Sequence, residues 1–359
     1  MRLIRPLYVV RVCAFLAGLG LAVPATAAPA PQSRKPATKT TAKAPAKKTP
    51  AKKPAYSASS SAARKARLAR ARAAARAREQ ARLKRLRALQ EAMTPRFKAD
   101  ANGDLVPDVR AAAAIIFDPQ TGQILWEENG QDKRSIASIT KVMTALVFLE
   151  DDPDLTRVVT IQRSDVYAAS TTFLRAAERV SVNNLLHLSL IASDNAAARA
   201  LARISHGGSA AFLERMNEKA LELGLESTTF ADPSGLNPDN ISSAYDLSRL
   251  ISLASADDRV AGIMRTPEYK VSTSRRTFTI RSTNHLLRGG EVDVMAGKTG
   301  FISKAGYCLA TLLKLPQSNH QVAVVVLGAT SNQARFWETR HLFDWLSQKA
   351  TDLLTKDQQ

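Results

Sequence analysis

The stretch SIASITKVMTALVFLE (residues 135–150) joins a hydroxyl, an amine and an apolar run, and it predicts a helix that begins close to Ser138. Ser138 and Lys141 are three residues apart, so on a helix their side chains share one face. A buried lysine near other cations has a lowered pKa and can take a hydroxyl proton near neutral pH. The free N–H groups of a helix start can also stabilise an oxyanion. Alone, this spacing is common and gives only a hypothesis of a serine nucleophile.

A second polar cluster, Ser193-Asp194-Asn195, interrupts the helical stretch of residues 180–203. The Ser193 hydroxyl can relay a proton between Lys141 and a leaving amine. The Asn195 amide can bind Lys141 and a substrate backbone. Asp194 is expected to cap a helix or orient its neighbours rather than to react.

The third cluster, Lys298-Thr299-Gly300, lies in a predicted strand over residues 292–301. An extended peptide can pair with such a strand at the edge of a sheet. Lys298 offers a positive charge and Thr299 a hydroxyl to a substrate carboxylate, while Gly300 would let the substrate approach closely. Found in this order on a helix start, an interhelical loop and a strand, the three clusters predict one site for acyl transfer.

The remaining pattern places strands at both ends of the last two-thirds of the chain and helices between them. This order favours an α/β or α+β protein whose central helices form a separate lobe. The expected strands are residues 109–118, 123–128, 157–162, 269–274, 276–280, 292–301, 306–315 and 321–330, and the expected helices are 141–150, two pieces within 180–203, 207–225, 243–255 and 334–354.

The net charge of +19 is concentrated near the N-terminus. Residues 28–98 hold 21 Lys and Arg against only Glu79 and Glu91, whereas the residues from 99 onward carry 27 basic and 30 acidic groups. The Pro- and Lys-rich part, to about residue 60, is expected to be disordered, and the Ala/Arg/Leu-rich part, 61–93, to form a solvated helix that ends at Thr94-Pro95. We therefore expect a basic tail over 28–100 and a catalytic domain over 104–350.

The tail is interpreted either as an adhesive for polyanions or as a soluble spacer. In an exported protein the polyanion would be the anionic cell wall or the headgroups of a membrane surface. Nucleic acid is not favoured, because charge alone is not sequence readout and no series of aromatic residues is interleaved with the basic ones, Tyr56 standing alone among those before Thr94.

The first 27 residues have the pattern of a secretory signal. A basic start precedes the apolar run Val12–Val23, and Ala25-Thr26-Ala27 forms a cleavage site. Cleavage after Ala27 is expected, with an uncleaved anchor over Leu7–Val23 as the alternative. The protein is therefore predicted to be exported and periplasmic or otherwise associated with the cell envelope.

Neither a metal site nor a cofactor site is predicted. The histidines, cysteines and acidic residues show no ligand spacing, and no histidine fits a Ser/His/Asp arrangement. Cys13 lies in the predicted signal, which leaves Cys308 alone in an apolar run, where a buried core thiol is expected.

From residue 104 to about residue 345, the chain resembles the penicillin-binding serine DD-peptidases of low molecular mass. The resemblance implies a β-lactamase/transpeptidase-like fold: an antiparallel sheet flanked by helices, a helical lobe, and the active site between them. TNHLLR (283–288) and KTGFISKAGYCL (298–309) look most like the D-alanyl-D-alanine endopeptidase branch, the type of penicillin-binding protein 7. The other matching stretches are residues 135–150, 185–202 and 230–250.

This resemblance also implies the chemistry. A serine would be acylated by a D-alanyl peptide of peptidoglycan and freed by water, with no metal or cofactor, and β-lactams would be covalent inhibitors. The implied roles are Ser138 as nucleophile, Lys141 as its base, Ser193 as proton relay, Asn195 as orienting amide, Lys298, Thr299 and Gly300 as the substrate-binding strand, and the backbone N–H groups of Ser138 and Phe301 as the oxyanion hole.

The favoured function is DD-endopeptidase cleavage of peptidoglycan cross-links, between D-alanine and the D-centre of a diamino acid, in cell-wall remodelling. A DD-carboxypeptidase that removes a terminal D-Ala uses the same machinery and is an alternative. A class A β-lactamase is disfavoured, because Pro233 stands where the glutamate of the Glu-x-x-Leu-Asn signature would precede Leu236-Asn237. A wall- or polyanion-binding protein with a vestigial site is a further alternative, which the intact motifs disfavour.

Overall fold

The computed structural model describes residues 58–316 and 319–356. The chain divides into two units, Met1–Leu68 and Ala69–Gln359, so the boundary falls within the first helix. The predicted signal over 1–27, including Cys13, and the extended part of the tail up to residue 57 lie outside the described residues. Within the described ranges, no helix is both long enough and apolar enough to cross a membrane.

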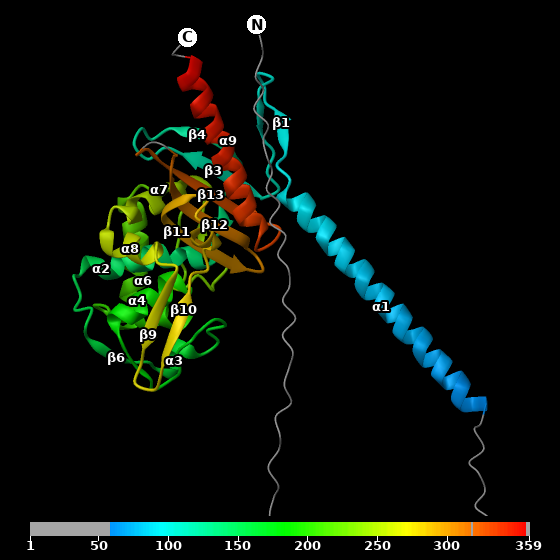
Figure 1. The fold of residues 1–359 in the computed structure, drawn as a ribbon. Helices are drawn as coiled ribbons and strands as arrows, with labels where there is room; N and C mark the ends of the chain where they lie inside the picture. Colours follow the sequence, from blue (N-terminus) through cyan, green and yellow to red (C-terminus); the bar gives the residue numbers. More distant parts are fainter. Residues whose placement is uncertain (1–57, 317–318, 357–359) are drawn as a thin grey trace, which may run out of the picture. The chain divides into compact units, whose positions relative to one another are not determined.

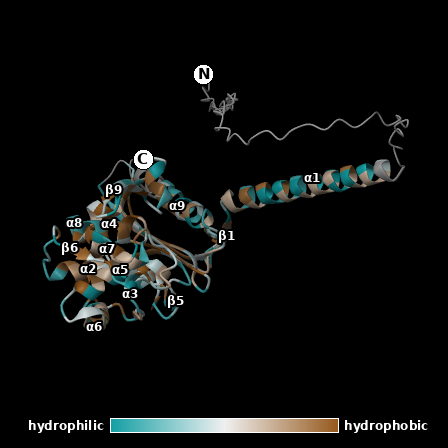
Figure 2. Ribbon diagram, turned by 90° about the horizontal axis from the view of Figure 1, so that it is seen from below, coloured by the Kyte–Doolittle hydropathy of each residue, from teal (hydrophilic) through white to brown (hydrophobic). Residues whose placement is uncertain are grey.

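Helix α1 spans Ala58–Met93. Its alanines, arginines and leucines are good helix formers, and it ends where Thr94 bonds back to Gln90 O ahead of Pro95. Leu68, Leu83, Leu86 and Leu89 are all exposed. Hydrophilic and hydrophobic residues are mixed around the helix rather than sorted into faces (Figure 2). The described part of the tail is therefore a solvated, basic helix.

A five-stranded antiparallel sheet in the order β11-β12-β13-β3-β4 forms the frame of the catalytic region. The central pairing is between β13 and β3, which joins the C-terminal strands to the N-terminal ones. Strand β11 stands at one edge of the sheet, with β4 at the other. The strands are β3 (Ala113–Phe117), β4 (Ile124–Glu128), β11 (Asp293–Ile302), β12 (Gly306–Lys314) and β13 (Gln321–Ala329).

Both faces of the sheet are covered, which explains why its central strands are apolar at nearly every position. Alternate residues point to opposite faces: Ile115 and Val325 join the core beneath the helical lobe, whereas Ile116 and Val324 join the core beneath α9 (Ala334–Lys356). Figure 1 shows α9 on one side of the sheet and the central helices on the other. The sheet thus holds β11 against the lobe that carries the other two motifs.

The helical lobe follows the predicted order closely. The two pieces expected within residues 180–203 are separate helices, α4 and α5, joined at Ser193-Asp194. Helix α8 was not predicted. The lobe and its small strands comprise α2 (Lys141–Glu150), α3 (Arg163–Val166), α4 (Val182–Ile191), α5 (Asn195–Ile204), α6 (Gly208–Glu222), α7 (Ala244–Ser255), α8 (Asp258–Met264), the 3₁₀ helices η1 (Ala137–Thr140) and η2 (His285–Arg288), and the pairs β5 (Arg134–Ser135) with β8 (Ile241–Ser242), β6 (Val158–Thr160) with β7 (Arg179–Ser181), and β9 (Glu268–Ser272) with β10 (Thr277–Arg281).

A short hairpin precedes the sheet, at residues that the sequence assigns partly to the tail. Strand β1 (Phe97–Ala99) pairs with β2 (Leu105–Pro107). Arg96 forms an ion pair with Asp108, and Lys98 with Glu128 at 2.8 Å. The ordered structure of this region therefore includes the last basic residues of the predicted tail.

Candidate active site

Ser138 lies in η1, which runs directly into α2 at Lys141. The spacing of three brings the Lys141 Nζ to 2.9 Å from the Ser138 Oγ. Ala137, just before the serine, has a left-handed φ of 49°, which turns the chain sharply into the 3₁₀ helix. The predicted hydroxyl–amine pair is thus formed, one tight turn ahead of the α-helix rather than within it.

The amine of Lys141 is held by two further acceptors. It donates to Asn195 Oδ1 at 2.6 Å and to the backbone carbonyl of Ser234. Neither oxygen can donate a proton in return, so in a neutral amine both hydrogens are committed and the lone pair is left for Ser138 Oγ. The network therefore orients Lys141 as a base toward the hydroxyl.

Burial also tunes this amine. Lys141 is 0 % exposed, and this desolvation lowers its pKa to about 7. The carboxylates of Asp232 and Asp194 oppose the shift, and Arg199 adds to it. A substantial fraction of Lys141 is therefore uncharged near neutral pH.

The Ser193-Asp194-Asn195 cluster forms the tight connection between α4 and α5. Ser193 has a left-handed φ of 59°, and its Oγ accepts a bond from Lys298 Nζ at 2.8 Å. Asp194 caps α5 by accepting from Ala197 N and is fully buried, as expected of a structural carboxylate. Asn195 also donates to Ala169 O at 2.7 Å. In the resting structure each serine hydroxyl thus contacts a lysine amine, Ser138 that of Lys141 and Ser193 that of Lys298, and the proton relay between Ser193 and Lys141 stays a prediction.

Lys298 and Thr299 lie on β11, the predicted edge strand. Burial, followed by the charges of Lys141 and Arg335, lowers the pKa of Lys298 well below its ordinary value. Besides Ser193, Lys298 Nζ contacts Thr299 O at 2.9 Å, and Thr299 Oγ1 lies 2.6 Å from Thr283 Oγ1. The strand thus presents a row of polar groups to the lobe.

Gly300 has a structural role in addition to the predicted one. A Cβ atom at this position would lie 2.6 Å from Ile136 O, in the segment that leads to Ser138. The glycine is therefore required by the close packing of β11 against η1, independently of any approach by a substrate.

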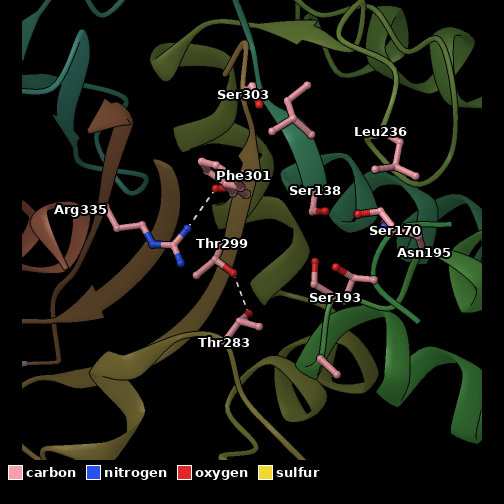
Figure 3. A pocket seen from close by; sticks show the side chains of 14 residues that line it. Ser138, Ser170, Ser193, Asn195, Leu236, Thr283, Thr299, Phe301, Ser303 and Arg335 are labelled. Atoms are coloured by element: carbon pink, nitrogen blue, oxygen red, sulfur yellow. Dashed lines mark hydrogen bonds between the residues drawn. The ribbon is translucent and has the colours of Figure 1, made fainter. Parts of the chain in front are cut away.

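Residues of all three motifs line one cavity of about 390 Å³, and Lys141 and Lys298 lie buried behind its wall. In Figure 3 the hydroxyls of Ser138 and Ser193 point into the same space beside β11. The two residues expected to supply oxyanion N–H groups, Ser138 and Phe301, line it as well, and Phe301 is half exposed. The remaining lining residues are Ser170, Thr171, Ala192, Asn195, Leu236, Thr283, Thr299, Gly300, Ile302, Ser303 and Arg335.

The loop of residues 230–240 contributes a group that sequence reasoning missed. Burial alone would raise the pKa of the Asp232 carboxyl, but hydrogen bonds from the Ser234 hydroxyl and from the backbone N–H groups of Asn237, Ser234 and Gly235 hold it below the ordinary value. This turn aims the Ser234 carbonyl at Lys141. Gly235 packs on the nucleophile segment, since its missing Cβ would lie 2.8 Å from Ser138 N. In the sequence, residues 230–250 contributed to the family resemblance, but no residue of this loop was assigned a role in the site.

Arg335 is the second missed residue. It is buried at the start of α9, and its Nη1 donates to Gly300 O at 3.0 Å and to Cys308 O at 3.1 Å. Desolvation lowers its pKa to about 10. In the described residues it has no carboxylate partner within ion-pair distance. An uncompensated cation therefore lies behind Gly300 at the cavity wall.

Among the residues that the structure describes, neither the free cysteine nor a metal-binding cluster is found at the site. Cys308 is a free, fully buried thiol whose pKa burial raises to about 11, so the expected core thiol is confirmed. Across residues 58–316 and 319–356, no group of three or more His, Cys, Asp or Glu side chains is arranged to hold a metal ion.

Comparison with known proteins gives consistent matches. The family model of peptidase S11, D-alanyl-D-alanine carboxypeptidase, matches residues 100–331, which contain all three motifs. A D-alanyl-D-alanine endopeptidase of Pseudomonas aeruginosa is 34% identical over 246 residues, 67% of this chain and 79% of that protein.

Solved structures share the fold. A mutant of the Streptomyces K15 DD-transpeptidase matches with a TM-score of 0.62 and 29% identity, over 67% of this chain and 98% of that one. Penicillin-binding protein D2 of Listeria monocytogenes, in a cefotaxime-bound form, matches with a TM-score of 0.59 and 30% identity, over 66% of this chain and 97% of that one. The predicted transpeptidase-like fold is confirmed.

Proposed function

The chain belongs to the D-alanyl-D-alanine carboxypeptidase family of serine peptidases, peptidase S11, and from this membership we propose that it is a DD-endopeptidase that hydrolyses D-alanyl cross-links of peptidoglycan. The observation that carries the proposal is the Lys141 amine, with a pKa of about 7, at 2.9 Å from Ser138 Oγ. The endopeptidase named in Pseudomonas aeruginosa supports the choice of bond.

In the proposed acylation step, Ser138 Oγ attacks the carbonyl carbon of the D-alanyl residue while its proton passes to Lys141. The developing oxyanion is stabilised by the backbone N–H groups of Ser138 and Phe301. Because Lys298 donates to Ser193 Oγ, the Ser193 hydroxyl proton is left to point toward the leaving amine. Ser193 gives that proton as the C–N bond breaks and regains one from Lys141.

In the proposed deacylation step, water attacks the acyl-enzyme ester and gives a proton to the same base. As the ester C–O bond breaks, the protonated Lys141 returns a proton to Ser138 Oγ, which regenerates the enzyme and releases a peptide that ends in D-alanine. A β-lactam would acylate Ser138 by the same route, since its amide carbonyl takes the place of the D-alanyl carbonyl. The proposed substrate-binding residues on the cavity walls are Thr299, Asn195 and Gly300. Lys298 lies buried behind them and acts through its bond to Ser193 Oγ.

Arg335 supports a substrate with a carboxylate next to the scissile bond. A buried guanidinium without an acidic partner is costly, and an arriving carboxylate offsets that cost. Both a D-centred diamino acid and a terminal D-alanine carry such a carboxylate. A DD-carboxypeptidase is therefore the second candidate, favoured by the description of the family.

A binding protein with a vestigial site is the least favoured reading. Residues without a chemical role are free to lose their geometry, yet the Lys141 and Lys298 amines each retain bonds to a serine hydroxyl. Both amines are also fully desolvated, which costs free energy that a purely structural site avoids.

The proposed substrate places the protein in the cell envelope, and we propose that it is exported to the periplasm. There the basic tail would meet anionic wall polymers or lipid headgroups. The exposed, evenly basic surface of α1 supports adhesion to such polyanions over the spacer reading.

The first test is covalent labelling by a fluorescent penicillin. The intact chain is expected to be labelled and the Ser138→Ala chain is not; equal labelling of both would refute the role of Ser138.

The second test is digestion of cross-linked and monomeric muropeptides, followed by mass spectrometry. Loss of the cross-link indicates an endopeptidase, whereas release of a terminal D-Ala indicates a carboxypeptidase.

A further inference from the structure

Four exposed arginines gather where the segment that continues from the cavity wall meets the β9–β10 hairpin, and together they are termed the arginine rim. Two lie on the segment that follows Ser170 and Thr171, and two lie at the tip of the β9–β10 hairpin. Backbone bonds join the two pieces, because Ser274 N donates to Arg179 O at 2.8 Å and Arg179 N donates to Ser274 Oγ at 2.9 Å. The rim consists of Arg175, Arg179, Arg275 and Arg276, all exposed.

The rim is fixed to the active-site wall. Ser170 and Thr171 line the cavity, and Thr171 O accepts from Asn195 N at 3.0 Å. Farther along the same segment, the buried Glu178 carboxylate accepts from Arg175 N at 2.9 Å and from Thr273 Oγ1 on the hairpin. Figure 1 shows α3 and the β9–β10 hairpin at the same end of the lobe. A ligand in the cavity that extends toward this end therefore reaches the rim.

The hairpin also orients one of the guanidinium groups. Arg276 Nη2 donates to Phe173 O at 2.5 Å, and its guanidinium lies 4.5 Å from the Phe278 ring centroid. Phe173 and Phe278 stack with centroids 5.8 Å apart. This packing leaves the other donors of the planar group for a ligand.

The positive charge of the rim is uncompensated. In the described part of the chain, none of the four arginines has an ion-pair partner within 4.0 Å. The nearby acids are committed elsewhere: Glu178 is buried, Asp165 pairs with Arg203, and Glu268 pairs with Arg281. Because the sequence from residue 99 onward is slightly acidic as a whole, this concentration of positive charge requires an explanation.

We propose that the arginine rim is a binding site for the carboxylates of an acidic peptide, the part of the substrate that extends beyond the cavity. This inference rests on the proposed function. A cavity of about 390 Å³ holds only the residues around the scissile bond. A peptide linked through a diamino acid keeps free carboxylates outside that volume, and arginine recognises carboxylates through paired donors.

The test measures binding rather than turnover, in the full chain carrying Ser138→Ala so that no hydrolysis occurs. The probes are a cross-linked peptide dimer with free carboxylates and the same dimer with those carboxylates amidated. Arg175→Gln together with Arg179→Gln removes two charges whose side chains make no hydrogen bond to the described protein. We expect the Kd for the acidic dimer to rise about three- to tenfold at low salt, with the Kd for the amidated dimer unchanged and the difference lost at high salt.

Matched variants separate charge from structure. Lys133→Gln with Lys349→Gln removes equal charge from exposed positions outside the rim and is expected to leave the Kd unchanged. Arg175→Lys with Arg179→Lys is expected to restore most of the binding, and melting curves show whether each variant folds. Equal Kd values with and without the two rim charges, or an equal loss of binding in the control variant, would refute the proposal that the arginine rim binds the carboxylates. If the unmutated chain leaves the dimer uncleaved while the rim still binds it, the proposed endopeptidase function is refuted and the proposed carboxylate-binding site is retained.

Discussion

Lys141 decides the chemistry at the scale of single residues. Two oxygens that can only accept, Asn195 Oδ1 and Ser234 O, take its hydrogens, and full burial removes the water that would stabilise its charge. The same amine lies against Ser138 Oγ. Position and pKa therefore both favour proton transfer from Ser138.

The pKa of about 7 predicts the pH dependence of acylation. Below this pH the Lys141 amine holds its proton and cannot accept another, so the rate of penicillin acylation should fall about tenfold per pH unit. Above about pH 8 the amine is neutral and the rate should level off. Stopped-flow labelling between pH 5 and 9 measures this profile, and a rate independent of pH across 7 would contradict it.

Gly300→Ala should displace the segment that carries Ser138 and so disturb the site. The added methyl collides with Ile136 O, so η1 or β11 must shift, at a cost of about 1–3 kcal/mol in unfolding free energy and with slower acylation. Gly262→Ala is the matched control, because its Cβ meets nothing within 4 Å and its helix gains about 1 kcal/mol. Chemical denaturation and penicillin labelling would compare the two; equal stability of both variants would refute the collision.

At the scale of elements, the site is built where three kinds of structure meet: a 3₁₀ turn, an interhelical connection and an edge strand. The loop of residues 230–240 locks the first of these in place. Its Asp232 carboxylate organises the turn that brings the Ser234 carbonyl to Lys141 and Gly235 to the Ser138 backbone. Asp232 is thus a positioning residue that acts through the loop.

Asp232→Asn should slow acylation about ten- to a hundredfold, because one carboxylate oxygen is replaced by a donor that faces backbone N–H groups. Unfolding free energy should fall by about 2–3 kcal/mol. Asp239→Asn, an exposed change in the same loop, should leave both unchanged. Because the Asp232 charge also raises the Lys141 pKa, its loss should move the pH profile of acylation to lower pH. An unchanged profile together with an unchanged rate would argue against the positioning role of Asp232.

At the scale of the whole molecule, the excess of basic residues and the catalytic residues lie in different parts of the sequence. The basic residues concentrate before residue 99, whereas the sequence that carries the site is slightly acidic. The overall charge therefore says little about the catalytic region, and the local rim of arginines is visible only once the loop and the hairpin are placed together.

Removal of residues 28–94 should weaken retention on purified sacculi at low salt and leave penicillin acylation intact. The cut spares Arg96 and Lys98, because both form ion pairs within the folded region. Co-sedimentation across a salt series measures the effect, with a steeper salt dependence expected for the full chain. Equal retention of both chains would reduce the tail to a spacer.

Much of the fold follows from local pattern. The apolar run around Ile115 and Ile116, the turn at Pro119–Gly122 and the periodic runs after Lys141 and Ser243 each specify an element through neighbours a few residues apart. Helix α8 and the β1–β2 hairpin escaped prediction, because such short elements depend on tertiary contacts for their stability.

By itself, the sequence determined most of the longer elements, the concentration of charge before residue 99, and the three clusters whose order indicates acyl transfer, because these are properties of spacing and residue type. Only the tertiary structure decided that Ser193 pairs with Lys298, that Gly300 is required by Ile136, and that Ser234 O and Arg335 belong to the site. The physical reason is that these contacts join segments far apart in the chain, and all but the Ser193–Lys298 bond use backbone carbonyls, which every residue has and no motif can identify.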